Sequence, residues 1–170
     1  MNSSRISTLV LCSLLLFLGV PRMYAQSFPD RVVGTWTGIM YIYKEGSIRD
    51  SVTVRLTVSK GATPGTWPWK TEYLSAKMPM TKDYVLRLVD PAKQTYVTDE
   101  GGGVELTDYL FDNKLYCVFE THGVLLTSSY ELRGDELIFE VTSGKKLPGD
   151  SEVLNYTIPN LQRVVLKRTP

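Results

Sequence analysis

Aromatic residues alternate along one short stretch of the sequence, and their spacing suits the binding of an apolar molecule. Trp67, Trp69 and Tyr73 are separated by even numbers of residues, with Lys70 and Glu72 between them. In an extended strand, residues at even spacing share one face. Burying an unpaired lysine or glutamate is costly. We therefore expect Lys70 and Glu72 to meet water and the three aromatic side chains to point inward.

The same alternation adds two tyrosines to the inward face. A wall of aromatic rings with a few polar tips is typical of a site for an apolar or amphipathic ligand. Two interpretations stay open, because the volume between the rings depends on how the strands tilt. The interior is either a cavity that binds a small molecule, or a filled core in a structural or interaction protein that acts through its surface or loops. The predicted ligand contacts are Trp67, Trp69, Tyr73, Tyr84 and Tyr130.

The chain has one histidine, His122, and this limits its metal and catalytic chemistry. Sites built from several imidazoles are excluded, and so is the zinc-binding His-Glu-x-x-His pattern. The sequence also has no nucleophile elbow, phosphate loop or dinucleotide fingerprint. We therefore predict a protein that is not an enzyme and that uses no metal and no cofactor.

His122 itself is predicted to be exposed and dispensable. It precedes Gly123 at an expected turn, and by alternation it shares a face with Glu120 rather than with Cys117. Cys117 falls on the apolar face of its segment, where a buried thiol is expected. A second alternative function remains, in which His122 is the single axial ligand of a haem.

The first 25 residues have the pattern of a secretory signal. Arg5 precedes an apolar run of twelve residues, and Ala25 supplies a small residue at the cleavage position. This run is too short to cross a hydrocarbon core, which needs about 20 residues. We predict that residues 1–25 are a signal peptide, that residues 26–170 are one domain, and that the protein is secreted or periplasmic without a transmembrane segment.

The charge balance excludes some partners. The chain has 19 basic and 18 acidic residues, so its formal net charge is +1. No overall field exists to hold nucleic acid or an anionic membrane. The predicted partner is a small apolar or amphipathic molecule, and the composition does not specify an oligomeric state.

The elements that position these residues are β-strands. From residue 32 onward, apolar and polar residues alternate in about ten segments separated by short turns rich in Gly, Pro and Asp. Short turns make consecutive strands antiparallel, and closing the sheet removes its edges. We predict an all-β fold, a single antiparallel up-and-down barrel of about ten strands. The loosest connections are expected at 44–50, 75–82 and 143–151.

The first and last strands of the predicted barrel carry a recognisable pattern. The first strand begins with Gly34-Thr35-Trp36, and the last ends with Lys167-Arg168. This pattern resembles the calycin superfamily of lipocalins and fatty-acid-binding proteins. The resemblance implies a barrel whose closed end is plugged by Trp36, and an interior that holds a small ligand.

The resemblance also implies that a basic residue of the last strand lies across the Trp36 ring. Arg168 is the first choice and Arg163 the second. Such a contact contributes about 0.5–2 kcal/mol. The guanidinium can also donate hydrogen bonds to nearby carbonyl groups.

The predicted signal peptide can be tested directly. N-terminal sequencing of exported protein should give a chain that begins near Gln26. A chain that retains Met1, or one that carries a lipid on Cys12, would contradict this prediction.

Overall fold

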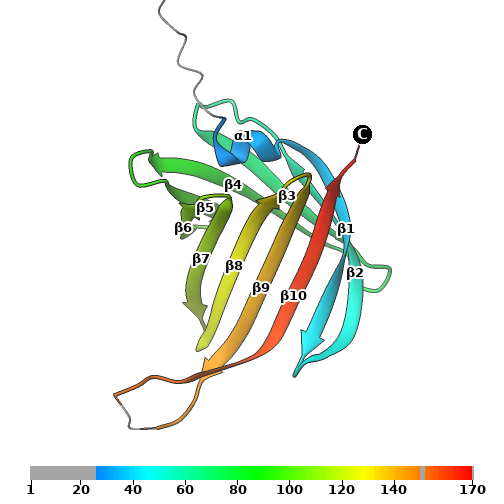
Figure 1. Cartoon of the computed structure of the whole chain (residues 1–170), viewed down its shortest axis with the longest axis vertical. Helices are drawn as coiled ribbons and strands as arrows, with labels where there is room; N and C mark the ends of the chain where they lie inside the picture. The colour runs from blue at the N-terminus through cyan, green and yellow to red at the C-terminus, as the bar shows by residue number, and fades with distance from the viewer. Residues whose placement is uncertain (1–25, 150–151, 170) are drawn as a thin grey trace, which may run out of the picture.

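The structure is a computed structural model that describes residues 26–149 and 152–169, so the predicted signal peptide lies outside the described residues. Ten antiparallel strands form one closed barrel, with a short helix before the first strand (Figure 1). The predicted all-β barrel of ten strands is confirmed. The elements are α1 (Phe28–Val32), β1 (Gly34–Lys44), β2 (Ser47–Val58), β3 (Thr66–Leu74), β4 (Met80–Asp90), β5 (Thr95–Gly101), β6 (Val104–Phe111), β7 (Lys114–Thr121), β8 (Val124–Arg133), β9 (Glu136–Lys146) and β10 (Tyr156–Arg168).

Every strand pairs with its neighbours in the sequence, and β1 pairs with β10 to close the sheet. In that closing ladder Trp36 lies opposite Arg168. Closure leaves no edge strand with unpaired backbone groups. Within the described residues, no helix is long and apolar enough to span a bilayer.

Alternation of side chains sets which residues fill the interior. Along β2, Val54, Leu56 and Val58 are buried, while Thr53, Arg55 and Thr57 alternate with them and are less buried. Full burial of one such apolar side chain contributes about 1.5–3 kcal/mol. The alternation of side chains therefore gives each strand one buried face and one solvent-exposed face.

Two of the predicted connections prove shorter than expected. Strands β1 and β2 are joined by Glu45 and Gly46 alone, with φ angles of 52° and 76°. Two residues in the left-handed region make a tight hairpin turn whose twist matches the strands. Residues 47–50, predicted to be loose, belong to β2, and residues 80–82, predicted likewise, belong to β4. Residues 143–146 belong to β9, so the third connection lies further along the chain, between Lys146 and Tyr156.

Helix α1 was not predicted, because five residues are too few to show a helical period. Its start is nevertheless marked in the sequence. Ser27 is the N-cap, and its hydroxyl accepts a hydrogen bond from the backbone N–H of Asp30 at 3.3 Å, with a proline in the first turn. The helix lies across one end of the barrel, which we call the closed end (Figure 1).

The closed end is plugged by Trp36 and α1. Trp36 is 1% exposed, and Phe28 and Val32 of the helix are buried in the same cluster. The indole Nε1–H of Trp36 donates a hydrogen bond to the backbone oxygen of Val32 at 2.8 Å. A second indole, that of Trp67, donates to a carboxylate oxygen of Asp30 at 3.1 Å. Both tryptophans therefore fix the helix over the barrel.

The predicted contact between Trp36 and Arg168 is present. The guanidinium carbon of Arg168 lies 4.2 Å from the Trp36 ring centroid. The same guanidinium donates hydrogen bonds to the backbone oxygens of Val33 and, at 2.8 Å, of Arg31. Arg163, the second choice, lies instead 3.3 Å from the carboxylate of Glu140. Arg168 thus joins the last strand to the segment that plugs the barrel.

Gly34 of the predicted motif has a clear reason to be glycine. Its φ of 131° is a conformation that residues with a side chain rarely adopt. A Cβ at this position would lie 2.6 Å from a guanidinium nitrogen of Arg168. The absence of a side chain at Gly34 therefore lets Arg168 reach across the closed end.

The closed-end contacts predict a measurable loss of stability. Trp36→Ala should lower the free energy of unfolding by about 3–5 kcal/mol, because it empties a packed core position. Arg168→Met should lower it by about 1–3 kcal/mol, because two carbonyl groups and an indole face lose their cation. Urea unfolding of the purified variants measures both.

Arg163→Met is the matched control, since it removes an arginine of the same strand whose ion pair is exposed. It should cost less than about 1 kcal/mol. Equal losses for Arg168→Met and Arg163→Met would contradict the role assigned to Arg168.

Candidate functional site

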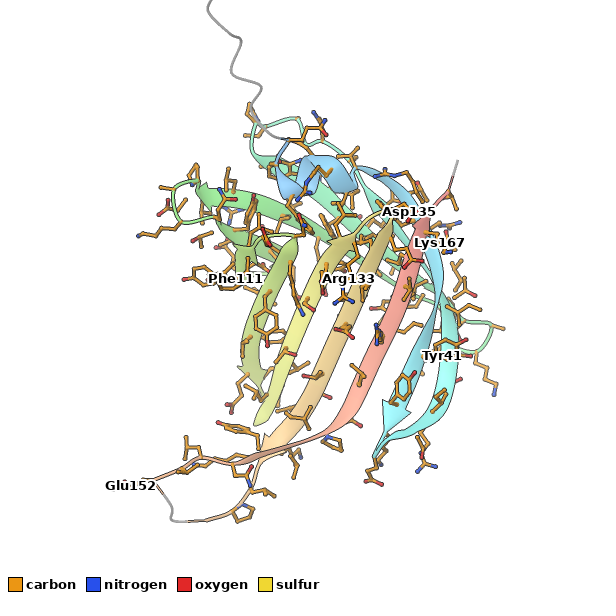
Figure 2. All side chains as sticks on the ribbon, in the orientation of Figure 1. Tyr41, Phe111, Arg133, Asp135, Glu152 and Lys167 are labelled. Carbon is orange, nitrogen blue, oxygen red and sulfur yellow. The ribbon has the colours of Figure 1, made fainter. Side chains whose placement is uncertain are left out.

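The barrel interior is filled at the closed end and hollow beyond it. A cavity of about 320 Å³ is lined by inward residues of strands β3 to β10. Its lining includes Met80, Glu100 and Phe119, which lie toward the opposite end, here called the far end. Figure 2 shows the two ends: Asp135, in the turn between β8 and β9, lies at the closed end, and Glu152 lies in the connection between β9 and β10 at the far end.

Three aromatic rings form one wall of the cavity. The rings of Tyr130 and Phe139 are stacked, with centroids 4.3 Å apart and planes 5° from parallel. Trp69 meets Tyr130 edge-on, with centroids 5.0 Å apart. Burial raises the pKa of the Tyr130 phenol, so this ring stays uncharged. The wall therefore offers a flat aromatic surface to a ligand.

Trp69 also brings an incompletely satisfied hydrogen-bond donor to this wall. Its side chain is 4% exposed, and its indole Nε1 makes no hydrogen bond of full geometry among the described residues, although it interacts with the Tyr130 hydroxyl and lowers the pKa of that phenol against the larger effect of burial. A buried indole N–H usually finds an acceptor. A ligand in the cavity can supply that acceptor.

Four of the five predicted contact residues line the cavity: Trp69, Tyr73, Tyr84 and Tyr130. Trp67 points inward as predicted, yet it does not line the cavity. Its ring lies at the closed end, bonded to Asp30 and 6.3 Å from the ring of Tyr96. Alternation fixes the face of a residue but not its level along the barrel axis, which depends on strand tilt and stagger. Trp67 therefore lies outside the cavity lining although it points inward, and its contact with a ligand stays a prediction.

The main polar group in the lining was not predicted. Asp108 of β6 is 5% exposed, and the hydroxyl of Thr98 donates a hydrogen bond to its carboxylate at 2.8 Å. Burial raises the pKa of Asp108 to about 6, against the effect of Thr98, and the charge of Glu100 acts in the same direction as burial. No described lysine or arginine forms an ion pair with it. Asp108 is thus a buried carboxyl group without a cation.

Asp108 begins a row of inward side chains around the wall, of which all but a valine can form hydrogen bonds. The strand register places Asp108 opposite Cys117, Cys117 opposite Ser128, Ser128 opposite Val141, and Val141 opposite Gln162. All five line the cavity. Burial raises the pKa of the Cys117 thiol to about 12, so it is a hydrogen-bonding group rather than a nucleophile.

Lys82 is the cation of the cavity wall. Its ammonium nitrogen lies 5.5 Å from the ring centroid of Tyr84. Burial lowers the pKa of Lys82, but its interactions with Tyr84, Tyr73 and Glu100 outweigh burial and leave it raised. Lys82 therefore stays charged at neutral pH. The lining holds this one cation together with two acidic residues, Asp108 and Glu100.

A signal for Asp108 is present in the sequence. It lies between Leu106 and Leu110 at even spacing, which assigns it to their face. Tyr109 and Phe111, the large aromatic residues of this strand, instead point outward and are 46% and 63% exposed. The alternation of side chains alone places Asp108 on the inner face of its strand. It also places Lys82 on the inner face, beside Tyr84.

His122 lies where the sequence predicted it, exposed in the turn between β7 and β8. Its φ is 50°, and its Nδ1 is 2.9 Å from the hydroxyl of Thr121. It is not part of the cavity lining. No group of three metal-ligating side chains occurs in the described part of the chain.

Comparisons with known proteins support the fold and give no information on the function. No protein-family model matches the chain, and no curated protein matches it significantly. The crystal structure of Rv2717c from M. tuberculosis superimposes with a TM-score of 0.50 at 16% identity, over 81% of this chain and 92% of that one. At this identity the likeness is one of fold alone, that of a closed antiparallel barrel.

Two further solved structures have lower scores. The fluorescent protein UnaG has a TM-score of 0.45 at 18% identity, over 82% of this chain and 98% of that one. A protein of unknown function of the DUF3598 family, from Nostoc punctiforme, has a TM-score of 0.46 at 18% identity, over 83% of this chain and 49% of that one. At these identities the likeness concerns the fold only.

The raised pKa of Asp108 predicts a dependence of stability on pH. The unfolded chain titrates this group near 3.8 and the folded protein near 6, so the folded state binds the extra proton between these values. The free energy of unfolding should therefore fall as pH rises through this window, by up to about 3 kcal/mol from this group.

Urea unfolding of the wild type and of Asp108→Asn, at pH values from 4 to 7.5, isolates the effect. The wild type should lose stability relative to the variant as pH rises from 4 to 6.5. A difference that stays constant across this range would show that Asp108 is not buried in this way.

Proposed function

We propose that the protein binds one small apolar or amphipathic molecule inside the barrel, and that it acts by binding rather than by catalysis. The observation that carries this proposal is the cavity of about 320 Å³ with its aromatic wall and its few polar groups. Sites for small organic molecules occupy pockets of about 300–1,000 Å³ with a mostly apolar lining and a few polar groups. The cavity falls at the lower end of that range.

The size of the cavity argues against a packing defect. Protein interiors are close-packed, with few voids larger than a water molecule. An empty cavity also costs stability in proportion to its volume. A space of this size, with a buried indole N–H in its wall that makes no hydrogen bond of full geometry, is better explained by a ligand that fills it.

Several observations favour binding over catalysis. The Cys117 thiol has its pKa raised to about 12, which makes it a poor nucleophile at neutral pH. His122, the one histidine, is an exposed turn residue away from the cavity lining. The same position gives no geometric support to a haem held inside the barrel by His122.

We further propose that the protein works outside the cytoplasm, either secreted or in a periplasm. The support is the leader-like pattern of residues 1–25. In such a compartment a single remaining cysteine forms no internal disulfide. The closed sheet and the plugged end then supply the stability that small exported proteins often take from disulfides.

A second candidate function is interaction with another protein through the outer face. Tyr109 and Phe111 of β6 are exposed on this face, with ring centroids 6.4 Å apart. Exposed aromatic residues are enriched at protein interfaces. This function does not require the cavity and is compatible with it.

Ligand binding can be tested with N-phenyl-1-naphthylamine, an uncharged fluorescent probe. We expect one probe to bind per barrel with increased emission. Trp69→Phe should weaken binding by about tenfold, because it removes part of the cavity wall, whereas Trp67→Phe should change it less than twofold. The two tryptophans lie on the same face of β3, and only Trp69 lines the cavity, so Trp67→Phe is the control for Trp69→Phe.

A variant whose cavity is filled by a larger side chain provides the decisive control. Leu106→Trp should place an indole in the cavity and abolish probe binding while the protein stays folded by circular dichroism. Probe binding that survives Leu106→Trp would contradict an interior site. Failure of the wild type to bind the probe would favour the surface function.

A further inference from the structure

We propose that the ligand carries a basic nitrogen, which the carboxylate of Asp108 holds inside the barrel. This inference rests on the proposed function and adds the chemical class of the ligand. It starts from three features of the wall: an unpaired carboxylate, an excess of acidic groups, and the aromatic surface of Tyr130.

The first feature is the position of Asp108 in the wall. Its carboxylate accepts a hydrogen bond from Thr98, and both residues line the cavity. Two carboxylate oxygens offer about four acceptor sites, so the hydroxyl and the backbone N–H of Thr98 leave about half of them free. A buried carboxylate is stable when it has a cation or several donors beside it. The described residues provide these two donors and no cation, so a ligand cation would complete the site.

The second feature is the charge of the lining. Asp108 and Glu100 are acidic, and Lys82 is the one cation among the residues that surround the cavity. Lys82 already faces the ring of Tyr84 and interacts with Glu100. An anionic ligand in this space would face an unpaired carboxylate, whereas an ammonium group would neutralise it. The wall therefore favours a cation over an anion.

The third feature is the surface that remains for the body of the ligand. The stacked rings of Tyr130 and Phe139, with Trp69 against them, form an apolar wall of the same cavity as Asp108. Aromatic faces also attract cations, which favours an amine over a neutral head group. The ligand class that fits all three features is a small amine with an apolar or aromatic body.

The competing possibility is a carboxylate ligand bound to Lys82. Such a ligand would place its head group beside the ring of Tyr84 and its apolar body toward Phe139. Its affinity would depend on Lys82 and not on Asp108. The two possibilities thus predict opposite orders of affinity for matched ligands.

Three ligands with the same body and different head groups separate these possibilities: 4-phenylbutylamine, 4-phenylbutan-1-ol and 4-phenylbutanoate. Isothermal titration calorimetry at pH 7.5 should show the amine binding at least tenfold more tightly than the alcohol, with the carboxylate weakest. Asp108→Asn, which keeps the size of the side chain, should remove the advantage of the amine and leave the alcohol unchanged within twofold.

Glu105→Gln is the matched control, because it removes an acidic group from the outer face of the same strand. It should leave all three affinities unchanged. Binding of N-phenyl-1-naphthylamine to each variant shows that the cavity is intact, so a loss of amine binding in Asp108→Asn cannot be ascribed to unfolding.

Equal affinities for the three ligands would overturn the inference, and so would tightest binding of the carboxylate with loss in Lys82→Met. If the naphthylamine probe binds and the amine neither binds nor competes, this inference fails while the proposed function stands. If neither the probe nor any of the three ligands binds, both fail.

Discussion

The whole structure depends on the closure of a ten-stranded sheet around a space that its inward side chains only partly fill. Eight strands enclose an interior that side chains can just fill, so ten strands leave more room. The protein fills one end with Trp36 and the short helix α1, and Arg168 fastens this plug to the last strand. The cavity is the part of the interior that this plug does not reach.

The same constraint explains the chemistry of the cavity. Closure pairs the backbone groups of neighbouring strands, so a polar side chain on the inner face finds few backbone partners. Asp108 has the hydroxyl and the backbone N–H of Thr98, and further donors must come from a ligand. The register brings Asp108 and Ser128 to one row of the wall, and the stacking of Tyr130 on Phe139 forms an apolar surface in the same space. A wall that combines an unpaired carboxylate with aromatic faces is suited to a molecule with a basic group and an apolar body.

Sequence alternation predicted the faces of the strands, because a period of two is a local property. It therefore placed Trp69 and Tyr130 inside the barrel and Lys70 outside it. It did not separate Trp67 from Trp69, since their levels follow from the tilt and stagger of all ten strands together. The five residues of α1 show no helical period, and their helix depends on packing against Trp36. Asp108 was missed because the exposed Tyr109 and Phe111 dominate the pattern of its strand.

Native mass spectrometry of protein isolated from the cells that make it shows directly whether the hollow half of the barrel holds a small molecule. We expect a species heavier than the bare chain by one small molecule, lost on gentle activation and absent from Leu106→Trp prepared in the same way. The bare chain alone, or an added mass that Leu106→Trp retains, would contradict it.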